Sequence, residues 1–90
     1  MSIDDWRTQI DEIDRKLVKL MNERSRCAIE IARIKKRYNM NVVDPEREKF
    51  VFRNVESANT GPFDAESLRR IFERIIEEIR SIERQVTGEK

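Results

Sequence analysis

The sequence contains no histidine, one cysteine, two glycines and two prolines among its 90 residues. Without histidine, no Ser-His-Asp or Cys-His nucleophile system can form, and the usual acid–base side chain for neutral pH is missing. Cys27 alone can make neither an intramolecular disulfide nor a zinc site. If the chain is an enzyme, its reaction should need little proton transfer by an imidazole.

An excess of one charge is also missing, because 19 basic and 18 acidic residues are mixed along the chain and leave a net charge of +1. Nucleic-acid binders usually gather a basic excess on one face. No apolar run is long enough to span a membrane, and residues 1–5 lack the layout of a signal peptide. We expect one cytoplasmic domain over residues 1–90, with no nucleic-acid or membrane partner.

One long helix is predicted at the start of the chain, where neither glycine nor proline occurs before Pro45. Apolar residues recur there in steps of three and four, the spacing of one buried helix face. The pattern predicts a helix over about residues 4–38, ended by the sequence Asn-Met-Asn at 39–41. The apolar positions are Ile3, Trp6, Ile10, Ile13, Leu17, Leu20, Cys27, Ile31, Ile34 and Tyr38.

Two shorter helices should follow. Asp44 is a good N-cap and Pro45 suits the first helical position, and the polar, glycine-containing stretch 57–62 should end this second helix. Asp64 caps the third helix, whose apolar face continues to Val86 before it stops near Gly88. The predicted fold class is all-α, with a three-helix protomer.

The length of the first helix favours an intertwined helical homodimer. About 35 residues give a rod of roughly 50 Å, whereas the third helix reaches only about 35 Å. The two shorter helices cannot easily cover the whole apolar seam, but a second copy of the chain laid along it can. The alternative is a long helix that bends and folds back on itself.

Charged residues occupy places on these helices where apolar ones are expected. Arg24 continues the apolar seam of the first helix, and Lys35 follows eleven residues later, close to three full turns. Arg47 on the second helix and Glu83 on the third border the apolar faces. The cations would suit a compact ligand with more than one negative group. Spacing alone favours a structural interpretation, with Arg24 extending to solvent or pairing between helices and Glu83 solvated.

Five segments of the chain resemble the all-helical chorismate mutases, also called the AroQ class. The combination is specific, because the Arg-to-Lys spacing of the first helix is followed by an Asp-Pro-x-Arg-Glu element at 44–48. The resemblance covers nearly the whole chain and rests on residues 6–14, 20–24, 32–35, 43–48 and 68–72.

This resemblance implies a dimeric enzyme that rearranges chorismate to prephenate in phenylalanine and tyrosine biosynthesis. The reaction is pericyclic and needs no nucleophile, metal or cofactor. By resemblance, Arg24 binds a substrate carboxylate, Lys35 contacts a carboxylate and the ether oxygen, and Arg7 is contributed across the interface by the partner protomer. A separation of about 25 Å along one helix agrees with placing Arg7 and Arg24 of one chain in different sites.

The remaining site residues are also assigned by resemblance. Arg47 matches a further cation near the site, and Asp44 and Glu48 match positions that contact the substrate hydroxyl. Ile79 stands where a serine-like residue is common, so a side-chain hydrogen bond is lost there. Glu83 stands where many members carry glutamine that bonds the ether oxygen. The expected catalytic residues are therefore Lys35, Arg24 and Glu83, and Glu83 must be protonated to donate a hydrogen bond.

Two other functions remain open at this point. An isochorismate pyruvate lyase resembles these mutases and uses a similar cationic pocket, although the element at 44–48 favours the mutase. The chain could also be a purely structural helical dimer. The linker at 61–64 resembles that of mutase domains fused to other shikimate-pathway enzymes, so association or fusion with such an enzyme is a further expectation.

Overall fold

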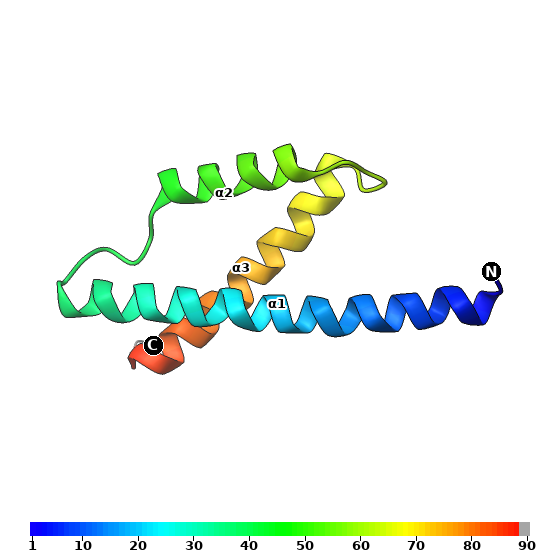
Figure 1. Cartoon of the computed structure of the whole chain (residues 1–90). Helices are drawn as coiled ribbons and strands as arrows, with labels where there is room; N and C mark the ends of the chain where they lie inside the picture. Colours follow the sequence, from blue (N-terminus) through cyan, green and yellow to red (C-terminus); the bar gives the residue numbers. More distant parts are fainter. Residues whose placement is uncertain (89–90) are drawn as a thin grey trace.

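Three α-helices make up the computed structural model, which describes residues 1–88 (Figure 1). They are α1 (Ile3–Arg37), α2 (Pro45–Ala58) and α3 (Ala65–Thr87). No strand occurs within the described part of the chain. The predicted all-α fold with three helices is therefore confirmed. None of these helices combines the length and apolar character that crossing a membrane requires.

Helix α1 is one continuous rod, so the alternative of a helix folded back on itself is wrong. Ser2 caps its start by accepting a hydrogen bond from the Asp5 amide, and the Asp5 side chain accepts one from the Ser2 amide in return. The last residue of the helix is Arg37, Tyr38 is its C-cap, and Asn39 follows with a φ of 52°. Asparagine tolerates this left-handed conformation better than most residues, which explains why the chain turns there.

The predicted aspartates cap the starts of both shorter helices. The Arg47 amide donates to Asp44 Oδ1 at 3.1 Å, and the Ser67 amide donates to Asp64 Oδ1 at 2.7 Å. Gly88 ends α3 with a φ of 76°, the left-handed conformation that glycine adopts without strain. Helix α2 continues to Ala58, so the first two residues of the stretch 57–62, which was predicted to end this helix, are still helical. Asn59 is the first residue past its end.

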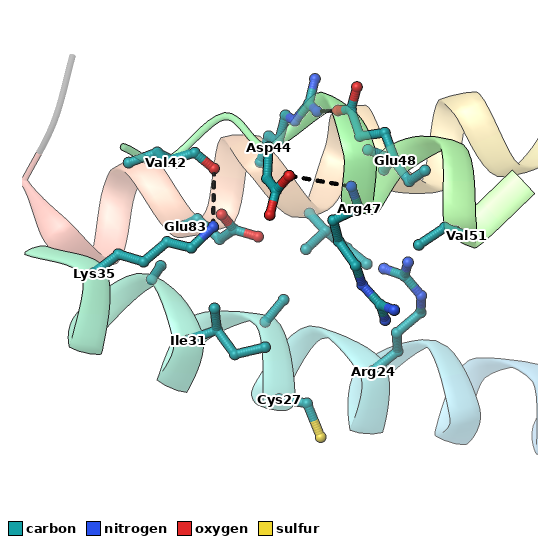
Figure 2. A pocket seen from close by; sticks show the side chains of 15 residues that line it. Arg24, Cys27, Ile31, Lys35, Val42, Asp44, Arg47, Glu48, Val51 and Glu83 are labelled. Atoms are coloured by element: carbon teal, nitrogen blue, oxygen red, sulfur yellow. Dashed lines mark hydrogen bonds and ion pairs between the residues drawn. The ribbon is translucent and has the colours of Figure 1, made fainter. Parts of the chain in front are cut away.

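Helix α3 holds the other two together. It packs against both α1 and α2, whereas no Cα atoms of α1 and α2 lie within 8 Å of each other in residues 1–88. Only Ala32 of α1 and Ile79 of α3 form a buried apolar core in this range, with 4% and 5% exposure. A gap thus remains between α1 and α2, and side chains from all three helices surround it (Figure 2).

The N-terminal half of α1 extends past the other two helices (Figure 1). The rest of residues 1–88 leaves its apolar side chains largely uncovered, and each remains at least 49% exposed. These residues are Ile3, Trp6, Ile10, Ile13, Leu17 and Leu20. The prediction that one chain cannot cover its own apolar seam is confirmed for these residues. We call them the free seam.

Candidate active site

A cavity of about 240 Å³ lies between the three helices. This volume is below the roughly 300–1,000 Å³ typical of pockets for drug-sized ligands, so it fits a small, compact molecule. Apolar side chains form much of its wall, with Cys27, Ile31, Val42, Val51, Ile76 and Ile79 among them. The charged side chains that line it are Arg24, Lys35, Asp44, Arg47, Glu48, Arg80 and Glu83.

Helix α1 supplies two cations to this cavity. Arg24 and Lys35 are both half-buried, and the buried Ala32 lies on the wall between them. The Lys35 Nζ donates a hydrogen bond to the Val42 carbonyl at 3.3 Å. Because an ammonium has three donors, two remain for a ligand. The spacing of eleven residues therefore places both cations on one face, as the sequence predicts.

Helix α2 presents its first turn to the cavity. Asp44 caps the helix, and this cap fixes the positions of Arg47 and Glu48. The Arg47 guanidinium lies 5.2 Å from the centre of the Phe50 ring, a favourable cation–π distance. Figure 2 shows Arg47 reaching from α2 and Arg24 from α1, so that their guanidinium groups face one another.

Helix α3 supplies Ile79 and, one turn later, Glu83. Ile79 is buried and Glu83 is half-buried, and Figure 2 shows Glu83 pointing into the same end of the cavity as Lys35. Burial raises the pKa of the Glu83 carboxyl above its ordinary value. Four nearby cations act against this rise in pKa; in decreasing order they are Arg80, Lys35, Arg24 and Arg84.

Arg80 is a cavity residue that the sequence analysis missed. It forms an ion pair with Glu48, and both side chains are about one-third exposed. Arg80 follows Ile79 directly and lies one turn after Ile76, which places it at the edge of the apolar face. That position in the sequence could have marked Arg80 as a candidate site residue. Its partner on α2 could not be predicted, since the pairing depends on how α2 and α3 pack.

The charges of the cavity favour an anion. Within residues 1–88, no carboxylate lies within 4.0 Å of a side-chain nitrogen of Arg24, Lys35 or Arg47. Four cationic and three acidic side chains line the cavity. The cations outnumber the acids by one when all seven groups are charged, and by two when Glu83 is protonated. Either balance favours a small anion.

The predicted site residues thus separate into two groups. Seven lie together around the cavity: Arg24, Lys35, Asp44, Arg47, Glu48, Ile79 and Glu83. Arg7 does not. Its side chain is 73% exposed and lies 3.8 Å from the Asp4 carboxylate. The position of Arg7 in the free half of α1 keeps it about 25 Å along the helix from Arg24.

Comparison with known proteins gives the same family throughout. Residues 6–84 match the family described as chorismate mutase type II. The chorismate mutase of Methanocaldococcus jannaschii is 33% identical over 84 residues, which cover 92% of this chain and 85% of that protein. The bifunctional chorismate mutase/prephenate dehydratase of Stutzerimonas stutzeri is 35% identical over 82 residues, or 86% of this chain.

The chain spans only 22% of the length of that bifunctional relative. Among solved structures, the chorismate mutase (form II) of Thermus thermophilus superposes with a TM-score of 0.86 at 30% identity, over 90% of this chain and 92% of that one. Form I of the same protein gives a TM-score of 0.82. The fold, the sequence match and the similar structures agree, and the chain belongs to the chorismate mutase type II family.

Proposed function

We propose that this chain converts chorismate to prephenate, the step that leads toward phenylalanine and tyrosine. The reaction is an intramolecular rearrangement in which a carbon–oxygen bond breaks while a carbon–carbon bond forms. One observation carries the proposal beyond family membership: Arg24, Lys35 and Arg47 line one small cavity without a carboxylate partner among the described residues. Such a cavity suits a substrate with two carboxylates.

Substrate binding is assigned to the arginines. A guanidinium can pair with a carboxylate through two parallel hydrogen bonds, which fixes both position and orientation. Arg24 binds one carboxylate, and Arg47 adds positive charge from the opposite side of the cavity. Together they hold chorismate in the compact, chair-like conformer that can react. Selecting this conformer supplies part of the rate enhancement, because the reacting carbons are brought close before the reaction.

The ether oxygen gains negative charge as its bond to carbon breaks, and Lys35 and Glu83 are assigned to stabilise it. Lys35 has free donors on its ammonium group. Glu83 donates a hydrogen bond only when protonated, and the raised pKa of its carboxyl favours that form. Donors already in place where charge develops lower the barrier without having to reorganise.

The substrate hydroxyl is assigned to Asp44 and Glu48, whose carboxylates can accept its hydrogen bond. Ile79 lines the same cavity but has no polar atom in its side chain. It therefore contributes an apolar contact and no hydrogen bond. The proposed catalytic residues are Lys35, Glu83 and Arg24, and the remaining lining groups bind and orient the substrate.

A homodimer completes the proposed site. The free seam of α1 leaves large apolar side chains exposed, and a second copy laid along it removes them from water. In the same arrangement Arg7 of one chain reaches the cavity of its partner, where it binds the second carboxylate. The exposure of Arg7 and its distance from Arg24 in one chain support this assignment.

The relatives also suggest a partner. Several are bifunctional chorismate mutase/prephenate dehydratases, such as the protein of Pseudomonas aeruginosa at 35% identity. We propose that this chain likewise works beside, or fused to, an enzyme that consumes prephenate. The expectations of one domain over residues 1–90 and of a cytoplasmic location stay predictions.

The proposed activity is tested by incubating the purified chain separately with chorismate and with isochorismate. We expect chorismate consumption with formation of prephenate, and stabilisation of the folded protein by chorismate in a thermal melt. Pyruvate released from isochorismate, without prephenate from chorismate, would instead identify a lyase. A protein that neither converts nor is stabilised by either compound would be a structural dimer.

A further inference from the structure

The ion pair between Arg80 and Glu48 is the only contact of its kind between α2 and α3 in the described residues. Arg80 comes from the helix that packs against both others, whereas α2 has no backbone contact with α1. Both side chains line the cavity, and both are about one-third exposed. The pair therefore ties the first turn of α2 to α3 at the edge of the site.

The negative charge of Glu48 explains why its ion pair with Arg80 matters for substrate binding. An ionised carboxylate beside a dianionic substrate is repulsive, and every unit of negative charge in a small cavity weakens binding. A guanidinium paired with Glu48 offsets this charge. The carboxylate has two oxygens with about four acceptor sites, so pairing with Arg80 still leaves acceptors for a hydroxyl.

We infer that Arg80 is a positioning residue, which orients the Glu48 carboxylate toward the substrate hydroxyl and offsets its charge against the substrate dianion. This inference rests on the proposed function and adds a residue to it. Arg80 acts through Glu48 and does not itself bind the substrate. Because the hydroxyl contact is present before and during the reaction, losing it weakens binding more than it slows the chemical step.

Arg80 has a second measurable effect, through Glu83. Arg80 is the strongest of the cations that lower the pKa of the Glu83 carboxyl. The charged groups that share the cavity with Glu83 are Lys35 and Arg24 from α1, Asp44, Arg47 and Glu48 from α2 and its cap, and Arg80 from α3. Removing the Arg80 charge raises the Glu83 pKa further, so the protonated, donating form persists to higher pH.

The experiment compares wild-type protein with Arg80→Met, which keeps the aliphatic stem, and with Arg80→Lys, which keeps the charge. We expect Arg80→Met to raise KM for chorismate about five- to tenfold with little change in kcat at low pH. Its kcat should begin to fall at a higher pH than in the wild type. Arg80→Lys should recover a large part of both properties.

Arg84→Met is the matched control, because Arg84 is also an α3 cation beside Glu83 but is exposed and lies outside the cavity lining. It should leave KM unchanged and shift the pH profile less, since Arg84 lowers the Glu83 pKa least of the four cations. Circular dichroism melts of all variants identify any loss of folding. If Arg80→Met unfolds, Arg80→Gln, which removes the charge but keeps a polar side chain, takes its place both as the single variant and in the double variant with Glu48→Gln.

A double variant separates positioning from direct binding. If Arg80 acts through Glu48, then Arg80→Met combined with Glu48→Gln raises KM no more than Glu48→Gln alone. Additive effects would mean that Arg80 contacts the substrate itself, and the inference would be overturned. If the wild type is active and Arg80→Met has the same KM for chorismate, the inference about Arg80 is also overturned. The proposed function would remain intact in that case. An inactive wild type would overturn both.

Discussion

In the proposed mechanism, the protonation of Glu83 decides whether its side chain can donate a hydrogen bond to the ether oxygen. Burial raises the pKa of its carboxyl, and the surrounding cations, led by Arg80, lower it. Two substrate carboxylates entering the cavity would raise the pKa again, since they disfavour a third negative charge. If Glu83 acts as the proposed donor, the activity depends on pH, whereas a glutamine at the same place would donate at any pH.

Replacing Glu83 with glutamine tests this dependence. In the wild type, kcat should decline as pH rises through the Glu83 pKa, because the ionised form cannot donate to the ether oxygen. In Glu83→Gln, kcat should stay flat across the same range. The measurement is kcat against pH for both proteins at saturating chorismate. Superimposable profiles would rule out Glu83 as a donor.

The raised pKa of the Glu83 carboxyl also predicts how the stability of the folded protein depends on pH. Its folded-state pKa is higher than its unfolded value, so the folded state holds the proton more tightly in the interval between the two. The free energy of unfolding should therefore decrease as pH rises from the unfolded pKa through the folded one. Denaturant titrations of wild type and Glu83→Gln should show this decrease in the wild type only. A wild type that becomes more stable relative to Glu83→Gln over that interval would contradict the raised pKa.

Lys35 should matter for the chemical step more than for binding. Lys35→Ala removes a donor to the developing charge, at a cost of roughly 3–4 kcal/mol, or a few hundredfold in kcat. Lys36→Ala is the control, since Lys36 is the same residue type one position later and instead donates to the Thr87 carbonyl. Lys36→Ala should keep normal turnover, and near-normal turnover by Lys35→Ala would refute its role.

Sequence alone could identify individual residues only where they break a pattern. Arg24 was visible because a guanidinium interrupts an apolar seam, and Lys35 because it lies near the same face. Both do line the cavity. Arg80 was missed as a site residue, because its significance comes from a contact with Glu48 that is 32 positions away in the chain. Pairings between helices follow from packing, which no local pattern records.

At the scale of the element, the start of α2 connects folding to the proposed chemistry. Asp44 satisfies the Arg47 amide at the helix end, and its side chain also lines the cavity. Asp64 makes the equivalent bond at the start of α3 but lies outside the cavity lining. These starts could be predicted from sequence because capping involves residues only three positions apart.

Substitutions at the two caps separate stability from activity. Asp44→Ala should lose about 1 kcal/mol of stability and also activity, because the cap and the hydroxyl contact are both removed. Asp44→Asn keeps a good cap, so it should retain stability while KM for chorismate changes. Asp64→Ala should lower the melting temperature without a specific loss of activity. Equal activity losses in Asp44→Ala and Asp64→Ala would mean that Asp44 acts only as a cap.

At the scale of the whole molecule, the sequence was enough to predict three helices, their approximate boundaries and the great length of the first. These features follow from the spacing of apolar residues and from the positions of helix-breaking residues. The way α3 packs against both α1 and α2, leaving a cavity between them, did not follow, because it depends on which apolar faces meet. The length of α1 was informative in another way. It predicted an apolar seam that one chain leaves uncovered, and the free seam from Ile3 to Leu20 is uncovered.

The proposed mechanism depends most on a site shared between two chains, with Arg7 from one and Arg24 and Lys35 from the other. The direct test mixes two inactive variants, Arg7→Ala and Arg24→Ala, under conditions that allow subunits to exchange. A mixed dimer has one site lacking both arginines and one complete site. Since about half of the dimers are mixed, the mixture should recover about a quarter of wild-type activity. Activity no higher than the average of the two separate variants would contradict the shared site.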